Sequence, residues 1–232
     1  MELVYLEEAH PKSFPKGRTF STFMKESYHI IFLKNYLSNQ NFGQRNSLHP
    51  SWNLETINNL ELKFGGKLQN GLNRLISFDE KLEDKIGFKN VTFAINFEDF
   101  FNAQINQTNI FYLHNEAGEI KSLNNIIIEY KYSNYPIKET TIKLALTPKE
   151  FINQEWEGNI NKIGGNPIWV QNHEDLCCPK CKNKMNFIFQ LDSGLPDLNP
   201  NNNYEIMFGN DGVCYAFWCE KDKISGYLWQ ST

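Results

Sequence analysis

The length, composition and charge of the chain exclude several classes of protein. Its 232 residues are 41% hydrophobic and 14% aromatic, which is too apolar for a disordered segment, yet no apolar run approaches the roughly 20 residues that cross a bilayer. The net charge is −4, residues 151–232 contain no Arg, and the N-terminus lacks a secretory signal, so we expect a cytoplasmic protein that binds neither nucleic acid nor membrane.

The first 60 residues predict a helical or irregular N-terminal extension. The apolar residues Phe20, Phe23 and Met24, and then Ile30, Ile31, Leu33 and Leu37, are spaced for one or two amphipathic helices. Residues 30–33 are also consistent with a short buried strand. We expect helix here.

The rest of the chain predicts short strands and one helix. Segments rich in β-branched or aromatic residues and bounded by Asn, Gly or Pro predict strands at 91–97, 110–113, 126–132, 141–146, 185–191 and 215–218. Thr147 and Pro148 have the residue types that begin a helix, predicted here at 148–156. We therefore expect an α+β fold dominated by antiparallel strands, forming a single domain over residues 1–232.

The two halves of the chain resemble degenerate repeats, at about 60–118 and 160–232. Gly65-Gly66 is followed by strand 91–97 and by Phe111–His114, and Gly164-Gly165 is followed in the same order by strand 185–191 and by Tyr215–Cys219. Two unrelated pairs of strands would give the same loose pattern. The copy in residues 61–150 has no cysteine, so a metal site would belong to residues 151–232.

The motif Cys178-Pro179-Lys180-Cys181 carries the strongest chemical signal in the sequence. Two thiolates at this spacing on a tight turn form half of a tetrahedral zinc site. Cys214 and Cys219 flank the last predicted strand, and their separation places them on opposite faces of a regular strand. Cys219, at the strand end, is the better third ligand. His173, Cys177 or Cys214 would supply the fourth, and we take His173 as the candidate.

Other interpretations of the cysteines remain open. A redox dithiol needs a helix that begins at its first cysteine, and the strand predicted from residue 185 leaves no room for one. A turn that has lost its metal is a second alternative, and a disulfide is disfavoured in a reducing compartment. Cys177 and Cys214 are best interpreted as small buried hydrophobic residues.

The segment Lys162–Gln171 contains the second feature, a glycine pair followed by Pro167 and Trp169. It lacks the Lys-Ser/Thr of a phosphate-binding loop, so it is interpreted as a turn that places Trp169 in the core or in a groove. A deep pocket lined by Trp169, Gln171, Gln190 and Asp211 would favour an enzyme or small-molecule binder; these four are the candidate binding residues. No catalytic motif or matched pair of acid and base is recognisable, so the sequence predicts no catalytic residue.

These motifs, in this order, resemble those of a known family. The string Lys162–Gln171, Cys178-Pro-Lys-Cys181, Met185-x-Phe187-x-x-Gln190, Phe208–Gly212 and Tyr215-x-Phe217-x-Cys219 resembles the YwqG-like family, a bacterial domain of unknown function, most strongly over residues 160–232. The same pieces are similar to the eukaryotic programmed cell death 2 protein family, whose members act as dedicated chaperones of a ribosomal protein. Phe64-Gly65-Gly66 is similar to a degenerate first copy, with no Pro-x-Trp after it.

The resemblance implies a non-enzymatic protein-binding module with a structural zinc knuckle, chaperone-like toward a basic client. Residues 151–232 contain 6 Lys and 10 Asp or Glu. This net negative charge would attract a basic protein partner. The candidate acidic surface is formed by Glu174, Asp175, Asp192, Asp197, Asp211 and Glu220. An immunity-type protein that neutralises a basic toxin is one alternative, and an uncharacterised enzyme or small-molecule binder is another.

Overall fold

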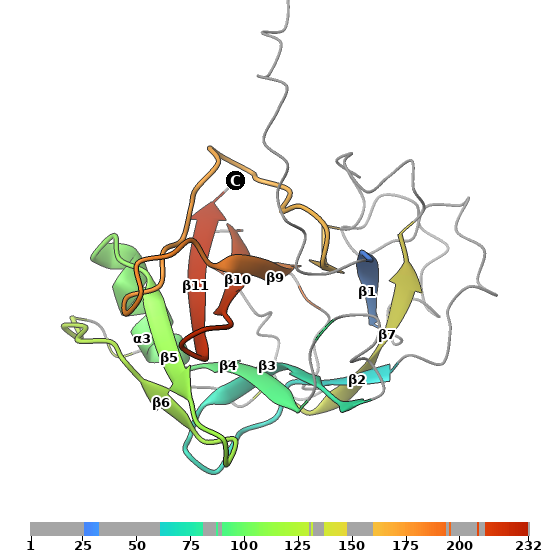
Figure 1. The fold of residues 1–232 in the computed structure, drawn as a ribbon, viewed down its shortest axis with the longest axis horizontal. Coiled ribbons are helices and arrows are strands. Elements are labelled where there is room, and N and C mark those ends of the chain that lie inside the picture. Colours follow the sequence, from blue (N-terminus) through green and yellow to red (C-terminus); the bar gives the residue numbers. More distant parts are fainter. Residues whose placement is uncertain are drawn as a thin grey trace, which may run out of the picture.

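The fold is one antiparallel sheet, seen in a computed structural model that describes residues 26–32, 61–80, 87, 90–129, 131, 137–147, 160–193, 195, 208 and 212–231 (Figure 1). Its eleven strands lie in the order β4-β3-β2-β7-β1-β8-β9-β10-β11-β5-β6, and every neighbouring pair is antiparallel. The elements are β1 (Tyr28–Phe32), β2 (Glu61–Phe64), β3 (Asn73–Phe78), β4 (Val91–Ile95), α3 (Phe97–Ile105), β5 (Ile110–His114), β6 (Ile120–Ser122), β7 (Thr140–Leu146), β8 (Lys162–Ile163), β9 (Asn186–Asp192), β10 (Gly212–Cys219) and β11 (Ile224–Ser231).

The expected α+β class is wrong, because the described part of the chain is all-β apart from the nine-residue helix α3. The predicted helical extension includes residues 28–32, which instead form β1 between β7 and β8. All five residues of β1 are buried. An apolar run of this length fits a buried strand as well as a helix, and the neighbouring strands decide between them. The rest of the predicted extension lies outside the described residues.

Most of the other predicted strands are confirmed. The segments 91–97, 110–113, 141–146, 185–191 and 215–218 coincide with β4, β5, β7, β9 and β10 within a few residues. The described residues of 126–132 form no strand, and side chains of α3 and of its C-cap Asn106 bind this backbone instead. Glu129 N donates to Asn102 Oδ1 at 2.9 Å, and Asn106 Nδ2 donates to the Ile127 carbonyl at 3.4 Å. The predicted helix at 148–156 lies outside the described residues.

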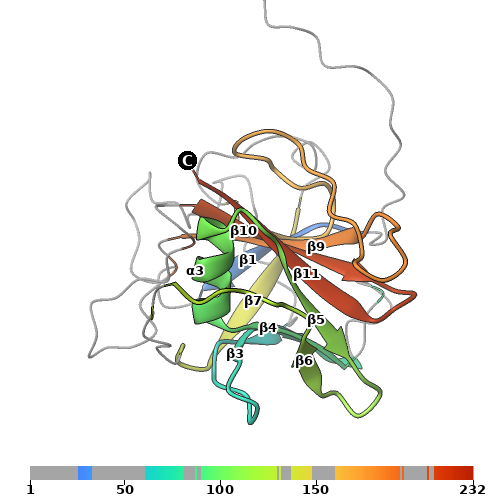
Figure 2. The same ribbon diagram turned by 90° about the vertical axis from the view of Figure 1, so that its left-hand side faces the viewer.

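Helix α3 ends the predicted strand 91–97 early. The Asn96 side chain caps the helix by accepting a hydrogen bond from Glu98 N at 2.9 Å. Glu98 and Asp99 lie in the first turn, where the helix dipole favours negative charge. The buried residues Phe97 and Phe100 then pack α3 on the main core, and the helix lies beside β5 (Figures 1 and 2).

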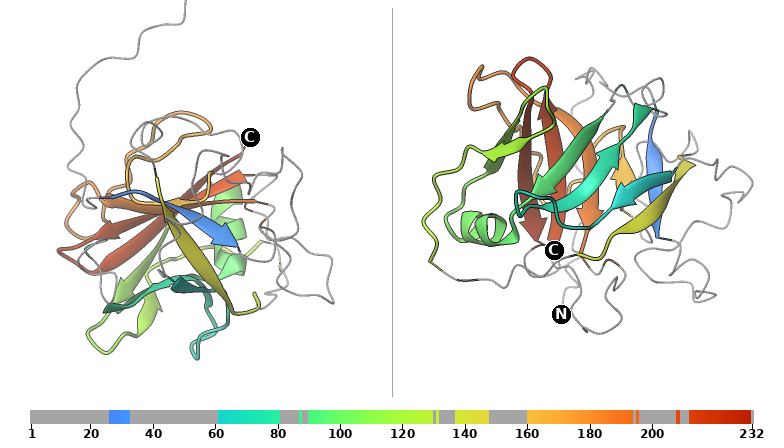
Figure 3. Two further views of the ribbon diagram at one scale, coloured as in Figure 1. Left: turned by 90° about the vertical axis from the view of Figure 1, so that its right-hand side faces the viewer. Right: turned by 90° about the horizontal axis from the view of Figure 1, so that it is seen from below.

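The sheet curves around one main core and nearly closes on itself (Figure 3). Phe93 of β4 lies at the centre, with ring centroids 5.3 Å from Phe189 of β9 and 5.8 Å from Trp218 of β10. Aromatic contacts therefore hold β4, at one end of the sheet order, against β9 and β10, which lie six and seven places away in that order. Among the described residues, no helix is long and apolar enough to cross a membrane.

A second, smaller core lies on the other face of β10. Residues 166–185, which we call the cover segment, place Trp169, Leu176 and Met185 against Tyr215 and Phe217. All eight residues of β10 are buried because each of its faces is covered, one by the main core and one by the cover segment.

Candidate metal centre

Three cysteines and one aspartate meet where the cover segment reaches the turn between β10 and β11. The Sγ atoms of Cys178, Cys181 and Cys219 and a carboxylate oxygen of Asp222 all lie within 4.8 Å of one another. Cys181 Sγ is 3.7 Å from Cys219 Sγ, and Asp222 Oδ2 is 3.3 Å from Cys178 Sγ and 3.6 Å from Cys219 Sγ. This cluster could hold a metal ion.

Two turns of similar shape supply the four donor atoms. The first knuckle is Cys178-Pro179-Lys180-Cys181, and the second knuckle is Cys219-Glu220-Lys221-Asp222. Each is followed by a lysine with a left-handed backbone, Lys182 at φ 63° and Lys223 at φ 53°. These two lysines turn the chain back so that both donors of a knuckle face the same centre.

Backbone hydrogen bonds fix the first knuckle at the tip of a hairpin formed by residues 176–185. Lys182 N donates to the Cys178 carbonyl at 3.0 Å, and Cys178 N donates to the Asn183 carbonyl at 2.9 Å. Met185 N donates to the Leu176 carbonyl at 2.8 Å. The second knuckle is the turn of the β10–β11 hairpin, where Cys219 pairs with Ile224. Two hairpins distant in sequence therefore meet at the cluster.

The pKa shifts in the cluster favour neutral thiols at Cys181 and Cys219 beside a charged Asp222 carboxylate. Burial raises the pKa of Cys219 to about 12. The hydrogen bond between Cys181 and Asp222 raises the pKa of Cys181. Hydrogen bonds from Cys181 and Cys178 lower the pKa of Asp222. Metal ligands must be deprotonated, so a bound cation would displace the thiol protons and take their place beside the carboxylate.

The structure brings together three of the four predicted metal ligands. Cys178, Cys181 and Cys219 are in the cluster, whereas the fourth position is taken by Asp222. The predicted fourth ligand, His173, lies with its ring 5.5 Å from the Trp169 ring and with Nε2 3.3 Å from Asp175 Oδ1. Sequence reasoning missed Asp222, although Cys219-x-x-Asp222 repeats the spacing of Cys178-x-x-Cys181.

The remaining cysteines lie outside the cluster. Cys214 is fully buried, as predicted, and burial raises the pKa of its thiol. Cys177 is exposed, so its interpretation as a buried hydrophobic residue is wrong. It precedes Cys178 in the hairpin, where alternation of side chains sends the two neighbours in opposite directions.

The predicted binding residues that the structure describes hold the cover segment on the sheet. Trp169 stacks on Tyr215 with ring centroids 4.7 Å apart. The buried Gln190 accepts a hydrogen bond from Ile168 N at 2.8 Å, and Gln171 Nε2 donates to the Ser231 carbonyl at 2.9 Å. Asp211 lies outside the described residues.

The predicted acidic surface is only partly available. Asp192 is buried, with 3% of its surface exposed. Asp175 forms an ion pair with Lys184, Glu174 accepts a hydrogen bond from Gln230 Nε2, and Glu220 accepts one from Trp218 Nε1. Asp197 and Asp211 lie outside the described residues. Glu174, Asp175 and Glu220 are exposed, and each also has a partner within the chain.

Comparison of the chain with models of known protein families finds no match, and comparisons with curated proteins and with solved structures find none either.

Proposed function

We propose that this protein is a non-enzymatic binding module whose cover segment is held in place by a structural zinc ion. The observation that best supports a zinc site is the set of distances between the donor atoms. A tetrahedral ion with bonds of about 2.3 Å to sulfur and about 2.1 Å to oxygen separates two sulfurs by about 3.8 Å and a sulfur from an oxygen by about 3.6 Å. Three of the six separations in the cluster, 3.7, 3.3 and 3.6 Å, lie close to these values, and the other three are within 4.8 Å.

The donor set favours zinc over other divalent ions. Thiolates select soft or borderline ions, whereas magnesium and calcium prefer sites made of oxygen atoms alone. Three sulfurs and one carboxylate oxygen arranged as a tetrahedron suit Zn²⁺, which has no preference of its own for another geometry. Iron–sulfur clusters use four cysteines in most cases, and the cluster has three.

The four protein donors support a structural role for the ion. A catalytic zinc keeps one coordination position for water or substrate, whereas four protein ligands fill a structural site. Here the ion would join the hairpin at 176–185 to the β10–β11 turn, and so fix the cover segment over Tyr215 and Phe217. The metal would then stabilise the fold and take no part in a reaction.

Analysis of metal content and stability tests the zinc site. The chain purified without chelator should contain one zinc per molecule, and both Cys178→Ser and Asp222→Asn should lower the zinc content and the melting temperature. Cys177→Ser is the matched control, because Cys177 is adjacent to the first knuckle and lies outside the cluster. A metal-free protein whose melting temperature does not change on addition of zinc would contradict the proposal.

The binding part of the proposal concerns a protein partner. It is supported by the resemblance of the Gly-Gly-x-Pro-x-Trp and Cys-x-x-Cys motifs to chaperone-like proteins and by the acidic balance of residues 151–232. Affinity purification from the native host, with mass spectrometry of the captured molecules, tests it. A basic protein recovered in stoichiometric amount supports the module, and a metabolite recovered in place of a protein supports an enzyme or small-molecule binder.

A further inference from the structure

The sheet has an internal twofold relation centred between β1 and β7. Outward from this pair the order is β7-β2-β3-β4 on one side and β1-β8-β9-β10 on the other. The registers agree residue by residue. On one side, His29 of β1 pairs with Lys162, and Lys162 pairs with Gln190. On the other side, Thr141 of β7 pairs with Lys63, and Lys63 pairs with Ser77. In the next strands Gln190 pairs with Tyr215, and Ser77 pairs with Thr92.

The glycine pairs support the same relation independently. Gly65 and Gly66 have φ of 70° and 83°, and Gly164 and Gly165 have φ of 72° and 67°. A Cβ atom added to Gly66 would lie 3.2 Å from Glu139, and one added to Gly165 would lie 3.1 Å from Ser27. Glu139 and Ser27 each precede the equivalent central strand by one residue. The predicted repeat therefore has equivalent glycines, but its strand alignment is wrong, because β4 is equivalent to β10 and not to β9.

In the second half, three side chains of the sheet hold the backbone of the cover segment. Lys162 Nζ donates to the Asn166 carbonyl at 2.9 Å. Gln190 Oε1 accepts from Ile168 N at 2.8 Å, and the Tyr215 hydroxyl donates to the Ile168 carbonyl at 2.8 Å. The Tyr215 oxygen also accepts from Val170 N at 3.2 Å. The protein thus binds an extended segment of its own chain on this face.

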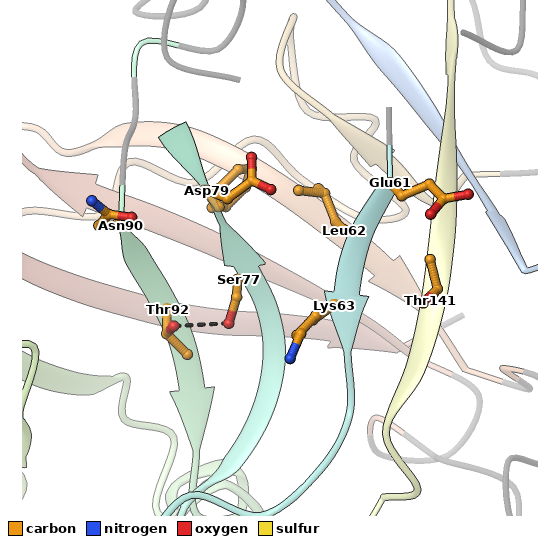
Figure 4. A pocket seen from close by; sticks show the side chains of 9 residues that line it. Glu61, Leu62, Lys63, Ser77, Asp79, Asn90, Thr92 and Thr141 are labelled. Atoms are coloured by element: carbon orange, nitrogen blue, oxygen red, sulfur yellow. Dashed lines mark hydrogen bonds between the residues drawn. The ribbon is translucent and has the colours of Figure 1, made fainter. Parts of the chain in front are cut away.

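The equivalent side chains of the first half are Lys63, Ser77 and Thr92, and they line an open groove of about 510 Å³ (Figure 4). Ser77 and Thr92 are smaller than Gln190 and Tyr215, and their hydroxyls are 2.8 Å apart. Lys63 forms an exposed ion pair with Glu139 at 3.6 Å, an interaction that contributes little to stability. In the sequence, no Pro-x-Trp follows Gly65-Gly66.

We infer that this groove binds an extended segment of a partner protein. Lys63, Ser77 and Thr92 hydrogen-bond the backbone of that segment, as their equivalents bind residues 166–170 of the cover segment. The space beside the two small hydroxyl residues takes one bulky side chain of the partner, in the place where Trp169 lies on Tyr215 in the second half. This inference rests on the proposed binding module and names its docking surface, and it involves none of the metal ligands.

Selection of peptides against the full zinc-loaded chain tests the groove. The probe is a phage-displayed library of random nonapeptides, and the affinity of each enriched peptide is then measured by fluorescence anisotropy. Thr92→Arg, which fills the groove, should weaken binding at least about tenfold, as expected when two hydrogen bonds are lost. Ser122→Arg on β6 is the matched control for the added charge, and it should leave the affinity unchanged. Lys180→Glu, on the first knuckle, tests docking at the metal site.

A second measurement guards against misfolding of the arginine variant. A photo-crosslinking amino acid at position 63, an exposed groove position, should capture the enriched peptide, and the same group at position 122 should not. Loss of binding in Lys180→Glu with full binding in Thr92→Arg would overturn the groove and keep the binding module. A library that yields no enriched peptide would also overturn the groove, whatever the zinc content proves to be.

Discussion

At the scale of single residues, the protein depends on a few positions where backbone shape or burial is unusual. A residue with a left-handed backbone follows each knuckle, and both glycines of each glycine-pair turn have a left-handed backbone. The fourth donor, Asp222, is close to its cysteine partners because Lys223 turns the chain directly after it. Each of these positions gives a substitution with a definite expected effect.

The first residue-scale prediction concerns the second glycine turn. Gly165→Val should lower the free energy of unfolding by more than about 1 kcal/mol, because a β-branched residue disfavours its φ of 67° and the new side chain meets Ser27. Gly118→Val is the control for backbone strain alone, since Gly118 has φ of 80° and nothing within 4 Å of an added Cβ. Urea unfolding measures both. Equal losses in the two variants would show that the contact with Ser27 has no effect.

The second residue-scale prediction concerns pH. His114 packs 5.0 Å from the Trp218 ring and bonds Ser225 Oγ at 2.8 Å, and burial lowers its pKa to about 4. The unfolded chain therefore binds a proton at higher pH than the folded one. The free energy of unfolding is therefore unaffected by the titration of His114 above about pH 6.5. It falls as the pH drops from there toward 4, by up to about 3 kcal/mol.

His114→Asn should flatten that part of the stability curve. Urea unfolding of the variant and of the natural chain at a series of pH values between 4 and 7 measures the difference, so that proton effects common to both cancel. Parallel curves would contradict the assignment of the pH dependence to His114.

At the scale of elements, the cover segment is the part of the fold that a metal ion at the proposed site would order most. Its contacts with β10 are aromatic, and its backbone is held by side chains such as Gln190 and Tyr215 rather than by a full strand ladder. The zinc ion of the proposed site would add a fixed point at the far end of the segment, at the first knuckle.

Removal of the metal should therefore loosen one face of the sheet and leave the other unchanged. In hydrogen exchange followed by mass spectrometry, chelation should speed exchange of amides in residues 176–185 and in the β10–β11 turn. Exchange in β2, β3 and β4 serves as the internal control and should stay slow. Uniform acceleration across the sheet would show that the ion stabilises the whole fold and has no local role.

At the scale of the whole molecule, the first half of the chain supplies strands that complete the sheet of the second half. β1 belongs to the first half in sequence and pairs both with β7 of that half and with β8 of the second half. β5 pairs with β11, and Phe93 joins both halves in one core. The second half alone lacks β1 and β5, and the first half alone lacks the rings of β9 and β10 that pack on Phe93.

Separate halves should consequently not fold. Fragments 1–150 and 151–232 are expected to lack native near-ultraviolet circular dichroism when separate, whereas the full chain should unfold in one calorimetric transition whose enthalpy equals the van't Hoff value. Zinc should be present during the measurement, so that loss of metal does not explain failure of the second fragment. Two separate transitions in the full chain would contradict the pairing of first-half strands with the second half as the basis of cooperativity.

The sequence by itself determined the features that depend on local chemistry. Alternating and β-branched residues predicted five of the strands, the Cys-x-x-Cys spacing predicted the first knuckle, and the paired glycines marked equivalent turns. These features follow from contacts between neighbours in the chain, because period, turn shape and ligand spacing are properties of a few residues.

Only the tertiary structure decided what depends on partners distant in sequence. β1 is a strand because β7 and β8 lie beside it, and 126–129 is not a strand because Asn102 and Asn106 bind its backbone. Asp222, and not His173, completes the cluster because two hairpins meet there. The open groove exists because small residues, Ser77 and Thr92, stand where the other half has Gln190 and Tyr215. Such outcomes are set by long-range packing, which a local pattern does not contain.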